Sequence, residues 1–295
     1  MFFSDTYIDD VLYEVKNETL NRLYTSFNEI VLSSLIFNDN LDNLEKENML
    51  HKINPFFHST SMICAYISNK TDTSSLSQET LDLYNNVLLE GGTTMPSEIN
   101  GAEFTHAFVA YKRGIFLLIT SNTEDTETLK IFKDKLTTQL SSSAALCDTC
   151  IGFSNYITGF DNISTMLLDA IFANASCILD NKKIVEIDNA PFDHIVFRDR
   201  YLHGSNPYYE RILEKLSETS SQRSPLLETL ITLIVNNGNV DQTAQEMFQH
   251  KNTIRYRMGK LKDIFAVDDD MEFYSKMYFF SRIHFSKPFL DVFFK

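Results

Sequence analysis

The sequence predicts an α+β protein in three parts: a helical N-terminal segment, a middle domain built on a sheet, and an all-α C-terminal domain. Near both ends of the chain, apolar residues recur every three or four positions, which is the spacing of amphipathic helices. In the middle, short apolar runs rich in strand formers alternate with helical patterns. A chain of 295 residues is also long enough for two or three compact domains.

The N-terminal segment, residues 1–58, is predicted to be helical. Across residues 5–52 the apolar side chains keep helical spacing with polar side chains between them, and the first proline is Pro55. We therefore expect helices over 5–52.

The middle domain, residues 59–190, is predicted to combine strands and helices. Gly91-Gly92 should end its first helix, and Lys112-Arg113-Gly114 should connect two strands as a hairpin. The order β-α-β-β-α-β, with an appended helix and strand, is that of a ferredoxin-like α+β domain with helices on one sheet face. The strands are expected at 61–67, 105–111, 115–120, 146–153 and 183–187, and the helices at 78–90, 126–140 and 163–178.

Residues 191–223 are predicted to be a helical connector and linker. An amphipathic helix is expected at 207–217, and the polar run 218–225 has the composition of a loop. We place the domain boundary there, so that 224–295 form the C-terminal domain.

The C-terminal domain begins with two helices separated by a tight stop. A leucine-rich stripe over 226–234 predicts a supporting helix, and Asn236-Asn237-Gly238 ends it. Asn239 is expected to cap the next helix, with Gln242 completing a capping box. Ala244 and Phe248, four positions apart, are expected to point inward.

A third helix should follow a turn at Gln249-His250-Lys251. Asn252 or Thr253 is expected to cap this helix. Two helices joined by a three-residue turn form the geometry that places a recognition helix in the major groove. One face of the third helix carries Ile254, Met258, Leu261 and Phe265, which leaves Arg255, Tyr256, Gly259, Lys260, Lys262 and Asp263 outside.

Charge is segregated along the chain. The formal net charge is −14, which argues against affinity for nucleic acid by the molecule as a whole. Residues 224–295 hold nine Lys and Arg against nine Asp and Glu, so all of that charge lies in 1–223. Within the neutral part, five basic residues fall between Lys251 and Lys262, with no acid among them. This distribution is typical of a DNA-contacting module attached to an acidic body.

The third helix therefore supplies candidate DNA contacts. Arg255 is the side chain expected to recognise a guanine edge, whereas the remaining basic residues should neutralise phosphates and fix the register. The alternative is an ordinary basic helix whose charged face is solvated and binds no DNA. The full set of predicted DNA-binding residues is Gln242, Thr243, His250, Lys251, Asn252, Thr253, Arg255, Tyr256, Arg257, Lys260 and Lys262.

These residues also carry a family resemblance. The runs LLETL at 226–230, Thr-Ala at 243–244 and HKNTIRYRMGK at 250–260 resemble the C-terminal helix-turn-helix of the PucR/CdaR family of bacterial transcription regulators. Residues 61–190, including IGFS at 151–154 before the helix that contains Ala170, are similar to the degenerate GGDEF-like domain often found in that family. The resemblance implies a regulator, often an activator of catabolic genes, that answers a small metabolite. The N-terminal segment matches no sensory module of the family, so the effector stays unassigned.

Enzymatic signals in the sequence are weak. A diguanylate cyclase needs a glycine-rich acidic hairpin to seat phosphates and metal, and residues 112–114 carry no paired acids. Cys147 and Cys150 have redox or zinc spacing without a second ligand pair, so we interpret them as structural. Asp268 to Asp270 precede an expected helix from Met271 and are interpreted as its N-cap. We predict no enzyme activity, no cofactor and no metal.

The predicted function is a ligand-responsive, DNA-binding transcription regulator of metabolic genes that binds double-stranded DNA with the helix 252–264. We expect a homodimer or higher homo-oligomer, since two recognition helices on half-sites multiply affinity, and an unknown small-molecule effector. No run approaches the roughly 18 to 20 apolar residues of a membrane span, and the N-terminus is acidic, so we expect no membrane partner and a cytoplasmic location. The alternative is a non-catalytic nucleotide- or metabolite-sensing interaction module whose basic helix binds an acidic protein.

Overall fold

The computed structural model describes residues 27–70, 96–143, 146, 148–202, 207–217 and 225–294. By its internal contacts the chain divides into two compact units, whose boundary falls between Pro191 and Phe192. The predicted domain boundary near 224 thus lies inside the second unit. The predicted helix at 78–90 with Gly91-Gly92, the helical pattern over 5–26, Cys147 and most of the polar run 218–225 fall outside the described residues.

The first unit opens on helices, as predicted for this part of the chain. One helix covers residues 27–37, and α2 (Asn43–Ile53) follows after a short break. α2 begins with a complete capping box, because Asp42 accepts from the backbone N–H of Glu45 while the Glu45 carboxylate accepts from the N–H of Asp42.

The sheet of the first unit has the ferredoxin-like strand order. Its four main strands run β3-β4-β1-β5, and all neighbouring pairs among them are antiparallel. Ile67 of β1 lies opposite Ile115 on one side and Ile151 on the other. Short edge strands extend this core, and β2 and β6 are too short for sequence periodicity to indicate. The strands are β1 (Ser61–Asn69), β2 (Glu98–Ile99), β3 (Ala102–Tyr111), β4 (Gly114–Ser121), β5 (Thr149–Phe153), β6 (Ile157–Thr158) and β7 (Ile184–Glu186).

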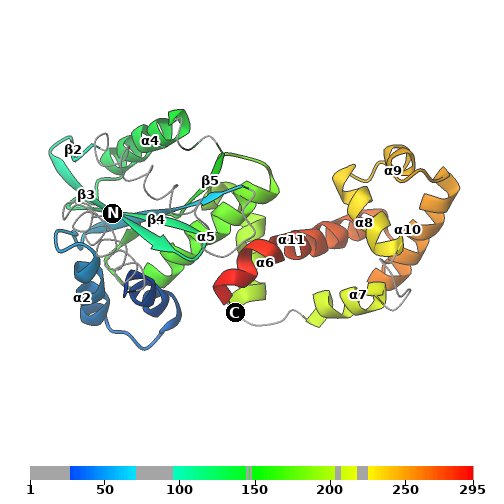
Figure 1. Cartoon of the computed structure of the whole chain (residues 1–295), viewed down its shortest axis with the longest axis horizontal. Helices are drawn as coiled ribbons and strands as arrows, with labels where there is room; N and C mark the ends of the chain where they lie inside the picture. Colours follow the sequence, from blue (N-terminus) through cyan, green and yellow to red (C-terminus); the bar gives the residue numbers. More distant parts are fainter. Residues whose placement is uncertain are drawn as a thin grey trace, which may run out of the picture. The chain divides into compact units, whose positions relative to one another are not determined.

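Helices cover both faces of this sheet (Figure 1). On one face, Phe132 of α4 (Thr126–Ser142) stacks on Phe104 of β3 with ring centroids 3.9 Å apart. On the other, α5 (Ile163–Leu179) places Asn174 where its amide oxygen accepts from Ser68 Oγ at 2.9 Å. The expectation of helices on one face is therefore wrong for α5. The physical reason is visible in β1 and β4, whose residues are buried on both faces nearly throughout.

Two glycines allow close backbone approaches in the first unit. A Cβ atom on Gly152 would lie 2.0 Å from the backbone nitrogen of Asn174, so α5 packs directly on β5 there. The predicted hairpin is present, but its turn is Lys112-Arg113, with Lys112 at φ 53°. Gly114 lies inside β4, where a Cβ would approach the Ile67 carbonyl oxygen to 2.3 Å.

The second unit is all helical, as predicted. Its buried side chains include Leu233, Phe265 and Phe273, and the buried Arg282 pairs with the buried carboxylate of Asp193. None of the described helices is both long and apolar enough to cross a membrane. The helices are α6 (Pro191–Leu202), α7 (Pro207–Ser217), α8 (Pro225–Val235), α9 (Val240–Glu246), α10 (Lys251–Phe265) and α11 (Asp270–Phe294).

Candidate nucleic-acid interface

A tight turn at residues 236–238 connects α8 to α9. Asn237 and Gly238 both adopt left-handed conformations, with φ of 51° and 79°, and the N–H of Gly238 donates to the Leu233 carbonyl at 2.7 Å. A Cβ atom on Gly238 would lie 2.6 Å from a ring carbon of Tyr274. The helix stop predicted at 236–238 is confirmed, and it requires glycine for space as well as for conformation.

α9 begins at the cap that the sequence predicts. The side-chain oxygen of Asn239 accepts from the N–H groups of Asp241 and Gln242, at 3.0 and 3.1 Å. Ala244 is buried, as expected for the small residue of the helix pair. Thr243 is wholly buried, and its hydroxyl donates to the Asn239 carbonyl at 2.8 Å.

Phe248 does not point inward, contrary to the prediction. The residue is 93% exposed and its φ is 52°. The spacing of four from Ala244 places two residues on one face only while the helix continues, and α9 ends at Glu246. Phe248 therefore lies in the turn, beyond the helix whose face the prediction assumed.

The cap of α10 also differs from the prediction. Nδ1 of His250 accepts from the N–H of Asn252 at 3.2 Å, and the helix starts at Lys251. The predicted caps Asn252 and Thr253 are wrong, because both residues lie within the first helical turn. The connection between the helices is 247–250 instead of 249–251. Imidazole is outside the side chains usually preferred at this position, which explains the error.

α10 packs through the apolar stripe that the sequence predicts. Ile254, Leu261 and Phe265 are buried and Met258 is partly buried, and the helix contacts both α8 and α9. The opposite face is open to solvent and carries Arg255, Tyr256, Gly259, Lys260 and Asp263.

The exposed basic side chains of α10 differ in how closely an acidic or polar partner approaches them. Arg255 is exposed, and its Nη1 lies 3.4 Å from Oδ1 of Asn252, which orients it along the N-terminal half of the helix. Lys251 lies 2.7 Å from the carboxylate of Asp241 on α9. Lys260 has a looser approach of 3.8 Å to Asp263, so its charge stays available on the surface.

Arg257 and Lys262 are engaged by the fold. Nη1 of Arg257 donates to Thr229 Oγ1 on α8 at 3.1 Å. Lys262 lies 2.5 Å from an Asp270 carboxylate oxygen and donates to the Asp268 carbonyl. The hydrogen bond that Lys262 donates to Asp270 raises the pKa of Lys262. Asp269 caps α11 through the N–H of Glu272, so the interpretation of this acidic run as an N-cap is confirmed.

The structure thus sorts the eleven predicted contact residues by accessibility. Buried Thr243 offers no side chain to a ligand, and Thr253, Arg257 and Lys262 are partly buried. Sequence reasoning anticipated neither the ion pair of Asp241 with Lys251 nor the exposure of Phe248, because both depend on how α9 and α10 are assembled. The exposed members are Gln242, His250, Lys251, Asn252, Arg255, Tyr256 and Lys260.

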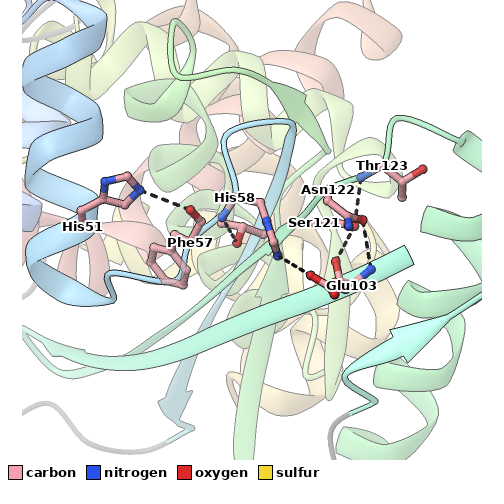
Figure 2. Close-up of polar contacts among 8 residues, drawn as sticks. His51, Phe57, His58, Glu103, Ser121, Asn122 and Thr123 are labelled. Carbon is pink, nitrogen blue, oxygen red and sulfur yellow. Dashed lines mark hydrogen bonds and ion pairs between the residues drawn. The ribbon is translucent and has the colours of Figure 1, made fainter. Parts of the chain in front are cut away.

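A second cluster of polar side chains lies in the first unit (Figure 2). Nε2 of His58 is 3.8 Å from a Glu103 carboxylate oxygen, and Ser121 and Asn122 bond the backbone of Glu103. His51 contacts the Phe57 carbonyl at 3.2 Å. Because most of these partners are backbone groups, the cluster fastens the chain entering β1 to the ends of β3 and β4. Among the described residues, no group of three or more His, Cys, Asp or Glu side chains is placed to hold a metal ion.

Comparison with known proteins assigns the helix pair. Residues 226–272 match the family model of the PucR C-terminal helix-turn-helix domain, which covers α8, α9 and α10. The family resemblance stated from the sequence is confirmed over this segment, and the second unit contains a DNA-binding helix-turn-helix of this type. No curated protein sequence matches the chain.

Among solved structures, the chain is similar to a regulator of polyketide synthase expression from Bifidobacterium adolescentis. The two chains are 14% identical, the match covers 88% of this chain and 94% of that one, and the TM-score is 0.35. The assignment of the helix-turn-helix rests on the family model.

Proposed function

Since residues 226–272 form a PucR-type helix-turn-helix, we propose that the chain is a ligand-responsive transcription regulator that binds duplex DNA with α10. One observation carries this proposal. The buried stripe of α10 holds the helix on α8 and α9, while Arg255 and Lys260 project from the opposite face into solvent. A helix held in this way can enter the major groove, which is wide enough to admit it.

The exposed side chains differ in what they can recognise. Arg255 presents a planar guanidinium that suits the paired acceptors of a guanine edge, and Asn252 lies beside it to position it. Lys251 and Lys260 act on phosphates as point charges, and His250, Gln242 and Tyr256 supply further polar groups around them. We leave Thr243 out of the contact set, and we assign Arg257 and Lys262 to the packing of the domain.

The wider role is inferred from the family resemblance and from symmetry. A homodimer would present two copies of α10 to two half-sites, which multiplies affinity and specificity. In this proposal the regulator acts in the cytoplasm on metabolic, often catabolic, genes, and a small molecule bound outside the helix-turn-helix sets its activity. The chain has no enzymatic role in this account.

A pair of substitutions tests the proposal. Arg255→Ala combined with Lys260→Ala should abolish binding of the full chain to its own promoter region in a gel-shift titration at moderate salt. The matched control is Arg211→Ala with Lys215→Ala, which removes the same charge from exposed positions on α7. Thermal unfolding of both variants should match the wild type, since neither pair is buried.

Two outcomes would contradict the proposal. One is full affinity in the variant that lacks Arg255 and Lys260. The other is binding of an acidic protein by α10 that excess duplex DNA does not displace, which would favour the interaction module instead.

A further inference from the structure

Phe248 occupies the turn between α9 and α10 in an arrangement that the fold itself does not favour. The residue is 93% exposed, and its φ of 52° lies in the left-handed region that residues other than Gly, Asn and Asp rarely adopt. Its N–H donates to the Gln245 carbonyl at 3.2 Å, so the backbone is held in this conformation. Among the described residues with positive φ, Phe248 is the one aromatic side chain.

The neighbouring turn uses residue types that tolerate the left-handed conformation. Between α8 and α9 the left-handed positions are taken by Asn237 and Gly238, the residue types that tolerate positive φ. A phenylalanine at 248 is unfavourable for backbone conformation and also leaves a large apolar surface in water. An outlier of this kind points to a role in binding.

The surroundings of Phe248 indicate which ligand it meets. The turn leads directly into His250, Lys251 and Arg255, which are exposed and form the start of the proposed DNA-contacting face. Cationic side chains next to the ring suit a polyanion that also offers an apolar group. In the major groove that group is the 5-methyl of thymine, which aromatic side chains contact.

We propose that Phe248 contacts the 5-methyl group of a thymine at the edge of the major groove and so determines sequence specificity at that base pair. The inference rests on the proposed DNA binding of α10 and adds to it an apolar contact beside the polar ones. Lysine and arginine contacts to phosphates hold the protein on DNA of any sequence, whereas this contact distinguishes thymine from cytosine.

The test uses Phe248→Asn and Phe248→Gly in the full chain. Both residues accept positive φ, so the melting temperature should stay level or rise while affinity for DNA falls. The probe is a duplex that the wild-type chain selects from a randomised pool, together with copies in which each thymine in turn is replaced by deoxyuridine, which lacks only the methyl group. The control is Phe56→Asn, which removes another exposed ring, 76% accessible, from the first unit.

We expect the wild type to lose at least about fivefold in affinity when one particular thymine is replaced, a loss on the scale of a single altered base pair. Phe248→Asn should bind the unmodified duplex about as weakly as the wild type binds the substituted one. The affinity of this variant should not change when that thymine is replaced. The slope of log K against log salt should be unchanged, because no phosphate contact is removed. Phe56→Asn should bind as the wild type does.

The inference is overturned if Phe248→Asn and Phe248→Gly bind as tightly as the wild type, or if no deoxyuridine replacement weakens the wild type. The second result together with weaker binding by both variants would assign the ring to the sugar-phosphate backbone instead. Failure of the proposed function is distinguishable, because the wild type would then select no duplex at all.

Discussion

The guanidinium of Arg257 on α10 donates to the hydroxyl oxygen of Thr229 on α8, with 3.1 Å between the two atoms. Thr229 is wholly buried, and its own hydroxyl proton goes to the Pro225 carbonyl at 2.7 Å. One of the five basic residues between Lys251 and Lys262 thus connects α10 to α8 instead of facing outward.

Arg257→Met should therefore lower stability more than it lowers the intrinsic affinity for DNA. We expect a loss of about 1.5 kcal/mol in the free energy of unfolding, the lower end of the range for a hydrogen bond to a charged group, because Arg257 is only partly buried. Arg255→Met is the matched control and should leave stability unchanged while weakening binding. Chemical denaturation and DNA titration of both variants separate the two roles, and a reversed pattern would refute the assignment.

Two glycines of the second unit should respond oppositely to alanine. Gly238→Ala forces a Cβ into the Tyr274 ring at φ 79° and should destabilise the unit by about 1 to 3 kcal/mol. Gly259 lies inside α10 with open space around its Cα, so Gly259→Ala should stabilise by up to about 1 kcal/mol. Thermal unfolding of the two variants checks both signs, and similar shifts in the same direction would count against the packing described.

The ion pair between Asp241 and Lys251 should restrain DNA affinity. The two charges lie 2.7 Å apart on the exposed surface, so Lys251 must leave Asp241 to reach a phosphate. Asp241→Asn removes the competing charge while keeping the helix start intact, since Asn239 and not Asp241 caps α9. We expect affinity to rise severalfold at low salt, with a smaller gain at high salt because screening weakens the effect. Unchanged affinity at both salt concentrations would show that Lys251 does not approach DNA.

A partly buried histidine, His284, predicts how the second unit responds to acid. Nδ1 of His284 lies 3.1 Å from the Tyr209 hydroxyl, and burial, together with the charge of Lys287, lowers its pKa. Because the folded-state pKa lies below the unfolded value of about 6.5, unfolding takes up a proton as the pH falls through that range. The contribution of neutral His284 to the stability of the fold is therefore complete above the unfolded-state pKa of about 6.5. It is lost progressively as the pH falls below that pKa.

His284→Gln should remove this dependence between about pH 7.5 and 5.5. Urea unfolding of the wild type and the variant at several pH values measures it. The same slope against pH in both proteins would show that His284 does not control the response.

The predictable part of the structure follows from local periodicity. The stripe of Ile254, Leu261 and Phe265 repeats at helical spacing, so the sequence alone indicates which face of α10 is buried. Asn239 is likewise recognisable as a cap, because it precedes a helical pattern and belongs to the preferred residue types. The strand order of the first unit follows from the succession of strand and helix patterns.

The parts that sequence reasoning missed depend on contacts between elements. Arg257 was assigned to phosphates because it is basic, although it lies three positions after Ile254 and four before Leu261 and so borders the buried stripe. Its hydrogen bond to Thr229 depends on where α8 lies, which spacing along α10 does not show. Similarly, Phe248 has the right spacing for the core, but the end of α9 at Glu246 removes it from the helix face. α5 was expected with the other helices because periodicity does not tell which face of a sheet a helix covers.

The salt dependence of DNA binding tests the central claim most directly. The affinity of the full chain for its promoter duplex, measured across a salt series, should fall linearly in log K against log salt, with a slope of several units set by the phosphates neutralised. Lys260→Ala should reduce the slope by about one unit, whereas Lys262→Ala, whose charge is held by Asp270, should leave it nearly unchanged. A flat dependence in the wild type, or equal slopes in the wild type and Lys260→Ala, would contradict the account in which the outer face of α10 lies against DNA.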